Sequence, residues 1–201
     1  MKENIFAIKD GKKHIGHGFL ANGYFISAAH VLRDNPNSFV KLKEEKKEFS
    51  KTKPLYVGRG KDTDPSFIDL VILKFENVEG GFPVLDYTPQ KDEVLESCCI
   101  RKVNGNEEYE LDVEPAWALG ESEGNYFYCK CNRDEGSSGS PLIKDNHVIG
   151  IMHGGEFVKK LIEKGELSEE EKLSLNLKDE DKICAFLKIS AFISLIENIN
   201  Q

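Results

Sequence analysis

The chain has 201 residues, 39% hydrophobic and 31% charged, a composition typical of a globular protein large enough for two packed halves. Its formal net charge of -8 argues against a nucleic-acid-binding protein, which usually presents a basic face. The N-terminal sequence MKENIFAIKDGKK lacks the apolar core of a signal peptide, and no run approaches the roughly 18 apolar residues of a membrane span. We therefore expect a cytoplasmic protein that binds neither nucleic acid nor a membrane.

Short candidate strands dominate the first 150 residues and are separated by clusters of Gly, Asn, Asp and Pro. In chain order they are NIFAIK, IGHGFL, YFISA, FVKLK, PLYVG and FIDLVILKF, and then, after a polar stretch at residues 76–93, VLESCCIRKV, YELDVEPAWAL, NYFYCKC, PLIKD and HVIGIMHG. Regular short strands with turn residues between them predict an all-β barrel or sandwich. The polar stretch is a candidate junction between two halves of similar size.

The C-terminal quarter has a different pattern. Residues 156–182 are highly charged and lack strand alternation, and Ser168 followed by Glu171 is a capping-box pattern that predicts a short helix over 168–175. KICAFLKIS then predicts one more strand. The last segment, 190–201, has the pattern of an amphipathic helix with Ser190 at its N-cap.

Five cysteines, an odd number without an export signal, favour reduced thiols. In YFYCKC, strand alternation places Phe127, Cys129 and Cys131 on one face. The chain has no second close cysteine pair and no nearby Cys-x-His, so buried small apolar residues explain the pair better than a zinc site. We predict no metal and no cofactor.

Three segments carry residues suited to acyl transfer. The loop EGSSGSP surrounds Ser138 with glycines, which allow backbone N–H groups to converge near its hydroxyl. His30 follows an apolar strand, and Asp69 interrupts an apolar run, where an acid needs a partner. A serine nucleophile needs a base, and an imidazole base needs an orienting carboxylate. Taken singly, each residue has an ordinary explanation: a strand-end histidine, a turn cap and a solubilising loop serine.

Taken together, ISAAHVL, IDLVILKF and GSSGSPLI resemble the His, Asp and Ser motifs of the trypsin-like, chymotrypsin-fold serine peptidases. They follow the family's order, with 39 residues from His30 to Asp69 and 69 from Asp69 to Ser138, a compact spacing like that of small bacterial members such as glutamyl endopeptidases. VIGIMHGG resembles the strand that pairs with substrate backbone, and KICAFLKISAFISLIENI resembles the last strand and C-terminal helix. The resemblance covers nearly the whole chain except 156–182.

The resemblance implies one peptidase domain over 1–201, built from two six-stranded antiparallel β-barrels. The N-terminal barrel would span 1–80, the C-terminal barrel 94–189 with the insertion 156–182, and the final helix 190–201. His30 would be the general base and acid, Asp69 its orienting carboxylate and Ser138 the nucleophile, with Gly136 and Ser138 supplying the oxyanion hole. The implied function is a serine endopeptidase that cleaves proteins or peptides through an acyl-enzyme intermediate.

Specificity is harder to predict. The resemblance places the base of the substrate pocket at Asn132, where an aspartate would select Arg or Lys, and Arg133 beside it would favour an acidic side chain. Glutamate- and glutamine-specific relatives carry a histidine at the position of Met152, whereas His153 lies one residue later and so on the opposite face of a strand. His153 is then either a specificity residue or a structural one. The predicted substrate-binding set is Asn132, Arg133, Met152, His153, Gly154 and Gly155.

Two features leave regulation and function open. Ser137 has no charge to pair with a newly cleaved N-terminal amine, so we expect a site that is preformed or gated by another route than trypsin-style activation. The insertion 156–182 would border the specificity pocket, where it either gates access or docks a regulatory partner, or else is a solvated excursion. The alternative functions are a peptide-binding module without turnover and a hydrolase of non-peptidic acyl groups.

Overall fold

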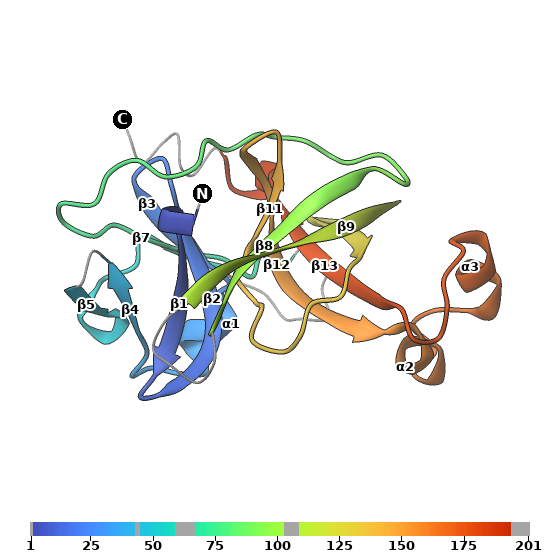
Figure 1. Ribbon diagram of the computed structural model, residues 1–201, viewed down its shortest axis with the longest axis horizontal. Coiled ribbons are helices and arrows are strands. Elements are labelled where there is room, and N and C mark those ends of the chain that lie inside the picture. Colours follow the sequence, from blue (N-terminus) through green and yellow to red (C-terminus); the bar gives the residue numbers. More distant parts are fainter. Residues whose placement is uncertain (1, 43–44, 59–66, 103–108, 194–201) are drawn as a thin grey trace.

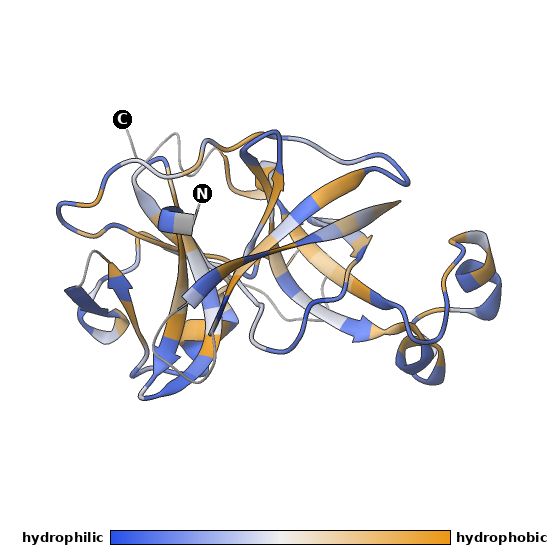
Figure 2. Ribbon diagram, in the orientation of Figure 1, coloured by the Kyte–Doolittle hydropathy of each residue, from blue (hydrophilic) through white to orange (hydrophobic). Residues whose placement is uncertain are grey.

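The computed structural model of the protein describes residues 2–42, 45–58, 67–102 and 109–193. Two β-structures lie side by side, joined by the long segment between β7 and β8 (Figure 1). Hydrophobic residues concentrate along the strands, and the tips of several hairpins are hydrophilic (Figure 2). The fold is therefore mostly β, as the alternation of short strands and turn residues predicted.

The N-terminal half is an open, barrel-like sheet of seven strands in the order β5-β4-β1-β2-β3-β7-β6. The sheet differs from the predicted closed six-stranded barrel, because the short, charged strand EKKE forms an additional edge, a composition typical of exposed edges. Asn22 and Gly23, both with positive φ, form the tight turn between β2 and β3. The elements are η1 Lys2–Asn4, β1 Ile5–Asp10, β2 Lys13–Ala21, β3 Tyr24–Ser27, α1 Ala29–Arg33, β4 Phe39–Leu42, β5 Glu45–Glu48, η2 Phe49–Lys51, β6 Tyr56–Val57 and β7 Val71–Leu73.

The C-terminal half is a closed six-stranded barrel in the order β10-β13-β12-β11-β8-β9, as predicted. Asp145 and Asn146, again with positive φ, turn the chain between β11 and β12. Its strands are β8 Val94–Lys102, β9 Tyr109–Glu123, β10 Tyr126–Lys130, β11 Pro141–Lys144, β12 His147–Phe157 and β13 Lys182–Lys188. The chain then forms η3 Ile189–Ala191, and the predicted helix over 190–201 lies mostly outside the described residues.

One hydrophobic cluster joins the two halves. Phe19 and Ile72 of the N-terminal sheet pack in the same cluster as Ile151 and Leu187 of the barrel, all at most 1% exposed. Each such side chain contributes about 1.5–3 kcal/mol on burial, so this cluster holds the two halves in a fixed relation. Functional residues carried by different halves are thereby held in a fixed geometry.

The barrel has its own core, which accounts for three of the cysteines. Cys129, Cys131 and Cys184 are at most 2% exposed and pack with Phe127 and Phe186. Burial raises the pKa of the Cys129 thiol, which therefore stays neutral. The predicted common face of Phe127, Cys129 and Cys131 is confirmed, and these residues serve as small apolar packing groups.

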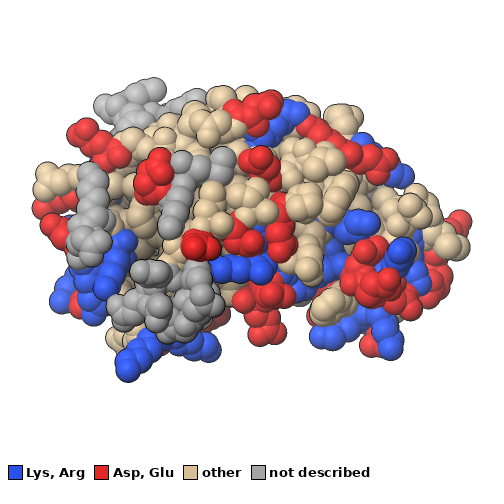
Figure 3. All heavy atoms as spheres, in the orientation of Figure 1, with Lys and Arg blue, Asp and Glu red and all other residues tan. Residues whose placement is uncertain are grey.

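The insertion contains two short helices, α2 Val158–Glu163 and α3 Glu169–Ser174, which project from the ends of β12 and β13 (Figure 1). The predicted capping box is present: Glu171 N–H donates to Ser168 Oγ at 3.1 Å, and Ser168 N–H donates to Glu171 Oε2 at 2.8 Å. Basic and acidic side chains are interspersed over the surface of this end of the molecule (Figure 3). Val158 and Leu177 are nevertheless buried against Leu119 of β9, so the insertion is packed onto the barrel. Within the described residues, no helix has the length and hydropathy of a membrane span.

Candidate active site

His30 and Asp69 meet at the edge of the N-terminal half. His30 lies in α1, immediately after β3, and Asp69 lies two residues before β7. The carboxylate accepts two bonds from His30: the main-chain N–H donates to Oδ1 at 2.9 Å, and Nδ1–H donates to Oδ2 at 2.5 Å. This pairing fixes the imidazole orientation and assigns its proton to Nδ1, which leaves Nε2 as the basic nitrogen.

A second histidine binds the same carboxylate. Nδ1 of His153 lies 2.6 Å from Asp69 Oδ2, and the rings of His30 and His153 meet edge to face with centroids 5.4 Å apart. His153 is the additional residue at a bulge in β12, where Met152 pairs with Phe186 and Gly154 with Ala185. The bulge turns the side chain away from the barrel core and toward Asp69, a use of bulges often found beside functional sites.

The donors around Asp69 keep it charged. Burial raises the pKa of its carboxyl, but hydrogen bonds from His153 and His30 lower it by more, so the pKa lies well below its usual range. The Asp69 side chain is 0% exposed, whereas those of His30 and His153 are 26% and 30% exposed. The two partly exposed imidazoles thus lie between the buried Asp69 carboxylate and solvent.

The loop carrying Ser138 lies between β10 and β11 and is held by backbone hydrogen bonds on both sides. His17 N–H donates to Ser138 O at 2.8 Å, and Gly139 N–H donates to Met152 O at 2.8 Å. Gly139 has φ +83°, and a Cβ there would lie 2.1 Å from the carbonyl oxygen of His17. Only glycine fits this close crossing, which fixes Ser138 between β2 and β12.

The Ser138 hydroxyl donates to the main-chain carbonyl of His153 at 3.1 Å, and no hydrogen bond joins it to His30 in the described part of the chain. A hydrogen bond between nucleophile and base is often absent until substrate binds. The N–H groups of Gly136 and Ser138 donate to no acceptor among the described residues. Two backbone donors are therefore available beside the hydroxyl.

A buried histidine that the sequence analysis did not identify supports this loop. His17 of β2 is 1% exposed, its Nδ1 lies 2.9 Å from Gly136 O, and its Nε2 accepts the Ile100 N–H at 3.1 Å. Burial, and secondarily the neighbouring His14, lower the pKa of His17 to about 3, so it is neutral. Its partners lie 83 and 119 residues away, and no local pattern in IGHGFL indicates them.

Two predicted substrate-binding residues are corrected by their positions. The Arg133 side chain is 0% exposed, and its guanidinium donates to Ser97 and to Asp112, so it has no donor directed at a substrate. Met152 is 2% exposed and belongs to the barrel core. Asn132 is exposed in the loop after β10, and Gly154 and Gly155 are accessible on β12 beyond His153.

His30, Asp69 and His153 also form a potential metal-ligand group. Their ligand atoms lie within 4.8 Å of one another. Two imidazoles and a carboxylate suit Zn²⁺, although both imidazoles already hydrogen-bond the carboxylate. The same residues can therefore either retain the hydrogen-bonded arrangement or accept a competing cation.

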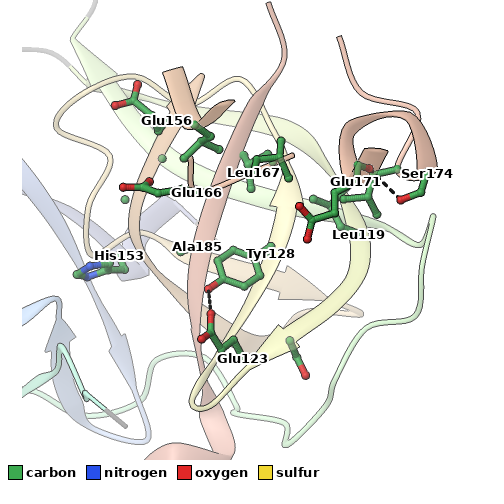
Figure 4. Close-up of a pocket in the computed structure, with 16 residues that line it drawn as sticks. Leu119, Glu123, Tyr128, His153, Glu156, Glu166, Leu167, Glu171, Ser174 and Ala185 are labelled. Atoms are coloured by element: carbon green, nitrogen blue, oxygen red, sulfur yellow. Dashed lines mark hydrogen bonds between the residues drawn. The ribbon is translucent and has the colours of Figure 1, made fainter. Parts of the chain in front are cut away.

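A cavity of about 840 Å³ begins beside these residues. His153, Gly154 and Gly155 line it near the candidate site, and residues of the insertion line its far wall (Figure 4). A Cβ at Gly154 would meet no atom within 4 Å, so the backbone there is open to an incoming chain.

Comparison with known proteins places this geometry in a family. The model of the trypsin-like peptidase domain matches residues 16–151. A comparison with curated protein sequences finds no match. The chain is similar to the serine protease domain of the Sesbania mosaic virus polyprotein, with TM-score 0.60, 15% identity and coverage of 94% of this chain and 90% of that one. It is also similar to neuropsin, a serine protease of mouse brain, with TM-score 0.61, 14% identity and coverage of 98% and 94%.

A third similar structure is the active form of a protease from M. tuberculosis, with TM-score 0.57, 16% identity and coverage of 96% of this chain and 78% of that one. At these identities the likenesses establish the chymotrypsin-type fold, and the family model, which spans more than half of the chain, establishes membership. The chain belongs to the trypsin-like peptidase family.

Proposed function

We propose that the protein is a serine endopeptidase in which Ser138 is the nucleophile, His30 the general base and acid, and Asp69 the orienting carboxylate. The observation that supports this most directly is the double hydrogen bond from His30 to the buried Asp69 carboxylate. It leaves Nε2 of His30 available for the Ser138 proton, beside a loop with two available N–H donors.

The reaction proceeds in two balanced steps. The Ser138 hydroxyl turns to His30, which takes its proton as Oγ attacks the peptide carbonyl, and the resulting oxyanion accepts the N–H groups of Gly136 and Ser138. His30 then gives the proton to the leaving nitrogen, and an acyl-enzyme remains. Water, deprotonated by His30, attacks the ester, and the returning proton restores Ser138.

The unpaired edge of β12 supports binding of an extended peptide. β11 pairs with β12 only as far as Ile151, whereas β13 continues to Phe157, so the described chain has no strand beside the other edge of 153–157. An added peptide strand would satisfy this edge. Because Ser138 Oγ lies 3.1 Å from His153 O, the N–H of the residue under attack reaches that carbonyl. Residues preceding the scissile bond then extend along Gly154 and Gly155.

A fluorophosphonate probe tests the proposal, because it reacts only with an activated serine. We expect the probe to label Ser138 in the wild-type protein, and labelling to disappear in His30→Ala and in Ser138→Ala. Far-UV circular dichroism of each variant establishes that it is folded. Absence of labelling in the folded wild-type protein would favour the alternative function, a peptide-binding module without turnover.

We also retain, as proposals from the sequence, a cytoplasmic location, a regulatory protein partner and a contribution of the exposed Asn132 to selection of the residue before the scissile bond. Cell fractionation tests the first, and cross-linking to the insertion tests the second. Cleavage-site profiling of wild type and Asn132→Asp tests the third, since a carboxylate there would shift preference toward Arg and Lys.

A further inference from the structure

The cavity beside His153 continues the proposed substrate path. The accessible residues Gly154 and Gly155 lie next to His153, and Glu156 and the insertion residue Leu161 also line the cavity. Figure 4 shows His153, Glu166 and Glu156 on one side of the cavity and Ser174 on the other, with Leu167 and Glu171 between the two sides. A peptide that pairs with the open edge of β12 therefore passes directly into this cavity.

Because His30 must protonate the leaving nitrogen, the chain after the scissile bond lies on the His30 side of Ser138. The chain before the scissile bond follows β12 away from Ser138, at about 3.3 Å per residue. The cavity is thus positioned for substrate residues a few places before the scissile bond.

The charged groups that line the cavity are all acidic. Within the described part of the chain, its four carboxylates come from β9, β12 and the insertion, and no Lys or Arg lines it. Two of the four are already compensated: Glu156 pairs with Lys160 and Lys164 at 3.4 and 3.1 Å, and Glu171 accepts the capping bonds of Ser168.

Among the residues that the structure describes, the other two carboxylates have no cationic partner. Glu123 accepts one hydrogen bond, from the Tyr128 hydroxyl at 3.5 Å. Glu166 makes no ion pair or side-chain hydrogen bond with any residue that the structure describes. A positively charged group entering the cavity would find these two carboxylates available.

Apolar side chains fill the remaining wall. Leu119 and Ile183 of the barrel and Leu161, Leu167 and Leu175 of the insertion line the cavity, and all but Leu161 belong to one packed hydrophobic cluster. A side chain that combines a long aliphatic stem with a cationic end matches such a lining, because the stem packs on the leucines while the charge reaches the carboxylates.

We propose that this cavity binds substrate residues preceding the scissile bond and selects Lys or Arg there, with the insertion as one wall of the subsite. The inference rests on the proposed peptidase function. It makes the insertion a specificity element, in contrast to a solvated excursion. The cavity would thus select a basic substrate side chain, whereas the sequence led us to expect selection of an acidic one by Arg133.

Peptides that carry Lys, Ala or Glu at each of the second to fifth positions before the scissile bond test this. We expect kcat/KM for at least one position to favour Lys over Ala by about threefold to tenfold at low salt, the effect of two exposed carboxylates. The preference should shrink at 1 M NaCl, where the Debye length is about 3 Å. In the Glu123→Gln, Glu166→Gln double variant, the ratio of kcat/KM for the Lys peptide to that for the Ala peptide should drop to about twofold or less.

The matched control is the Glu170→Gln, Glu180→Gln double variant, which removes the same number of charges at exposed positions outside the cavity lining. It should retain the wild-type selectivity. A second variant, Gly154→Leu, places a side chain in open space at the cavity mouth and should reduce the preference for Lys. Hydrolysis without preference for Lys, or a preference unchanged in the double variant, would overturn the inference and leave the peptidase function standing.

Binding to Ser138→Ala protein separates the two proposals, because it requires no turnover. Fluorescence anisotropy should show tighter binding of a Lys-containing peptide than of its Glu counterpart, with the difference lost in the added Glu123→Gln and Glu166→Gln changes. If Ser138-dependent hydrolysis is absent while this selective binding is present, the peptidase proposal fails, but the proposal that the cavity binds peptides with Lys or Arg is retained. Equal binding of both peptides overturns the inference.

Discussion

Acidification from pH 7.5 to pH 5 is expected to destabilise the fold because His17 gains a proton in the unfolded state and not in the folded state. This histidine is 1% exposed, and its Nε2 accepts the Ile100 N–H while Nδ1 lies 2.9 Å from Gly136 O. A proton on Nε2 would find the Ile100 carbonyl oxygen at 3.0 Å as its acceptor, so the main cost of protonation is the burial of an imidazolium charge. Burial, with a smaller effect of His14, therefore lowers the pKa of His17 to about 3.

The magnitude follows from linkage. An unfolded histidine has a pKa of about 6.5, so between pH 6.5 and about 3 the unfolded state binds a proton at this site that the folded state does not. The free energy of unfolding therefore falls as the pH falls through this window, by up to about 1.4 kcal/mol per pH unit. At pH 5, about 1.5 units below the unfolded value, the expected loss is about 2 kcal/mol relative to pH 7.5.

Urea unfolding of the wild-type protein and of His17→Gln at pH 7.5 and pH 5 measures this change in the free energy of unfolding. Glutamine keeps an N–H donor for Gly136 O but cannot titrate, and at pH 7.5 it should cost about 1–3 kcal/mol because the buried Ile100 N–H loses its acceptor. The variant should lack the additional loss of about 2 kcal/mol at pH 5. His14→Gln controls for the neighbouring half-buried imidazole. An equal loss on acidification in wild type and His17→Gln would refute the reasoning.

Three further predictions concern the site and its loop. His153→Phe keeps a ring but removes one donor to Asp69, and we expect kcat for a peptide to fall about tenfold or more while KM changes little; an unchanged kcat would show that His153 does not position the carboxylate. Gly139→Ala places a methyl group 2.1 Å from His17 O at φ +83°, and thermal unfolding should show a loss above about 3 kcal/mol; a variant as stable as wild type would contradict the close crossing. Zn²⁺ should inhibit reversibly by binding His30 and His153, with EDTA restoring activity and His153→Phe weakening the inhibition; equal inhibition of wild type and variant would place the metal elsewhere.

The features predictable from sequence are those set by short-range pattern. The strand that ends before His30, the alternation of Phe127, Cys129 and Cys131, and the Ser168–Glu171 capping box each depend on residues within a few positions of one another. Strand alternation, which is also local, predicts that Met152 and His153 face opposite ways. This is confirmed, because Met152 lies in the barrel core and His153 contacts Asp69.

The features that were missed depend on pairs distant in sequence. Arg133 looked available for an acidic substrate because nothing near it indicates Ser97 and Asp112, which lie 36 and 21 residues earlier. His17 gave no signal, because Ile100 and Gly136 reach it only through the packing of two halves. The extra strand of the N-terminal sheet was missed because EKKE has no apolar face to reveal it.

We predict that substrate binding frees the Ser138 hydroxyl from the main-chain carbonyl of His153, because the hydroxyl and the substrate N–H compete for that oxygen. The carbonyl of His153 now accepts the Ser138 hydroxyl at 3.1 Å, and the proposed peptide strand brings an N–H to the same oxygen. Because an N–H that takes this acceptor removes the hydroxyl's present partner, the serine rotamer directed at His30 becomes favoured. N-methylation of the residue that carries the scissile carbonyl should then lower kcat, and not only raise KM, relative to the unmethylated peptide. If methylation raises KM alone, with kcat unchanged, the bond between Ser138 and His153 does not restrain the nucleophile.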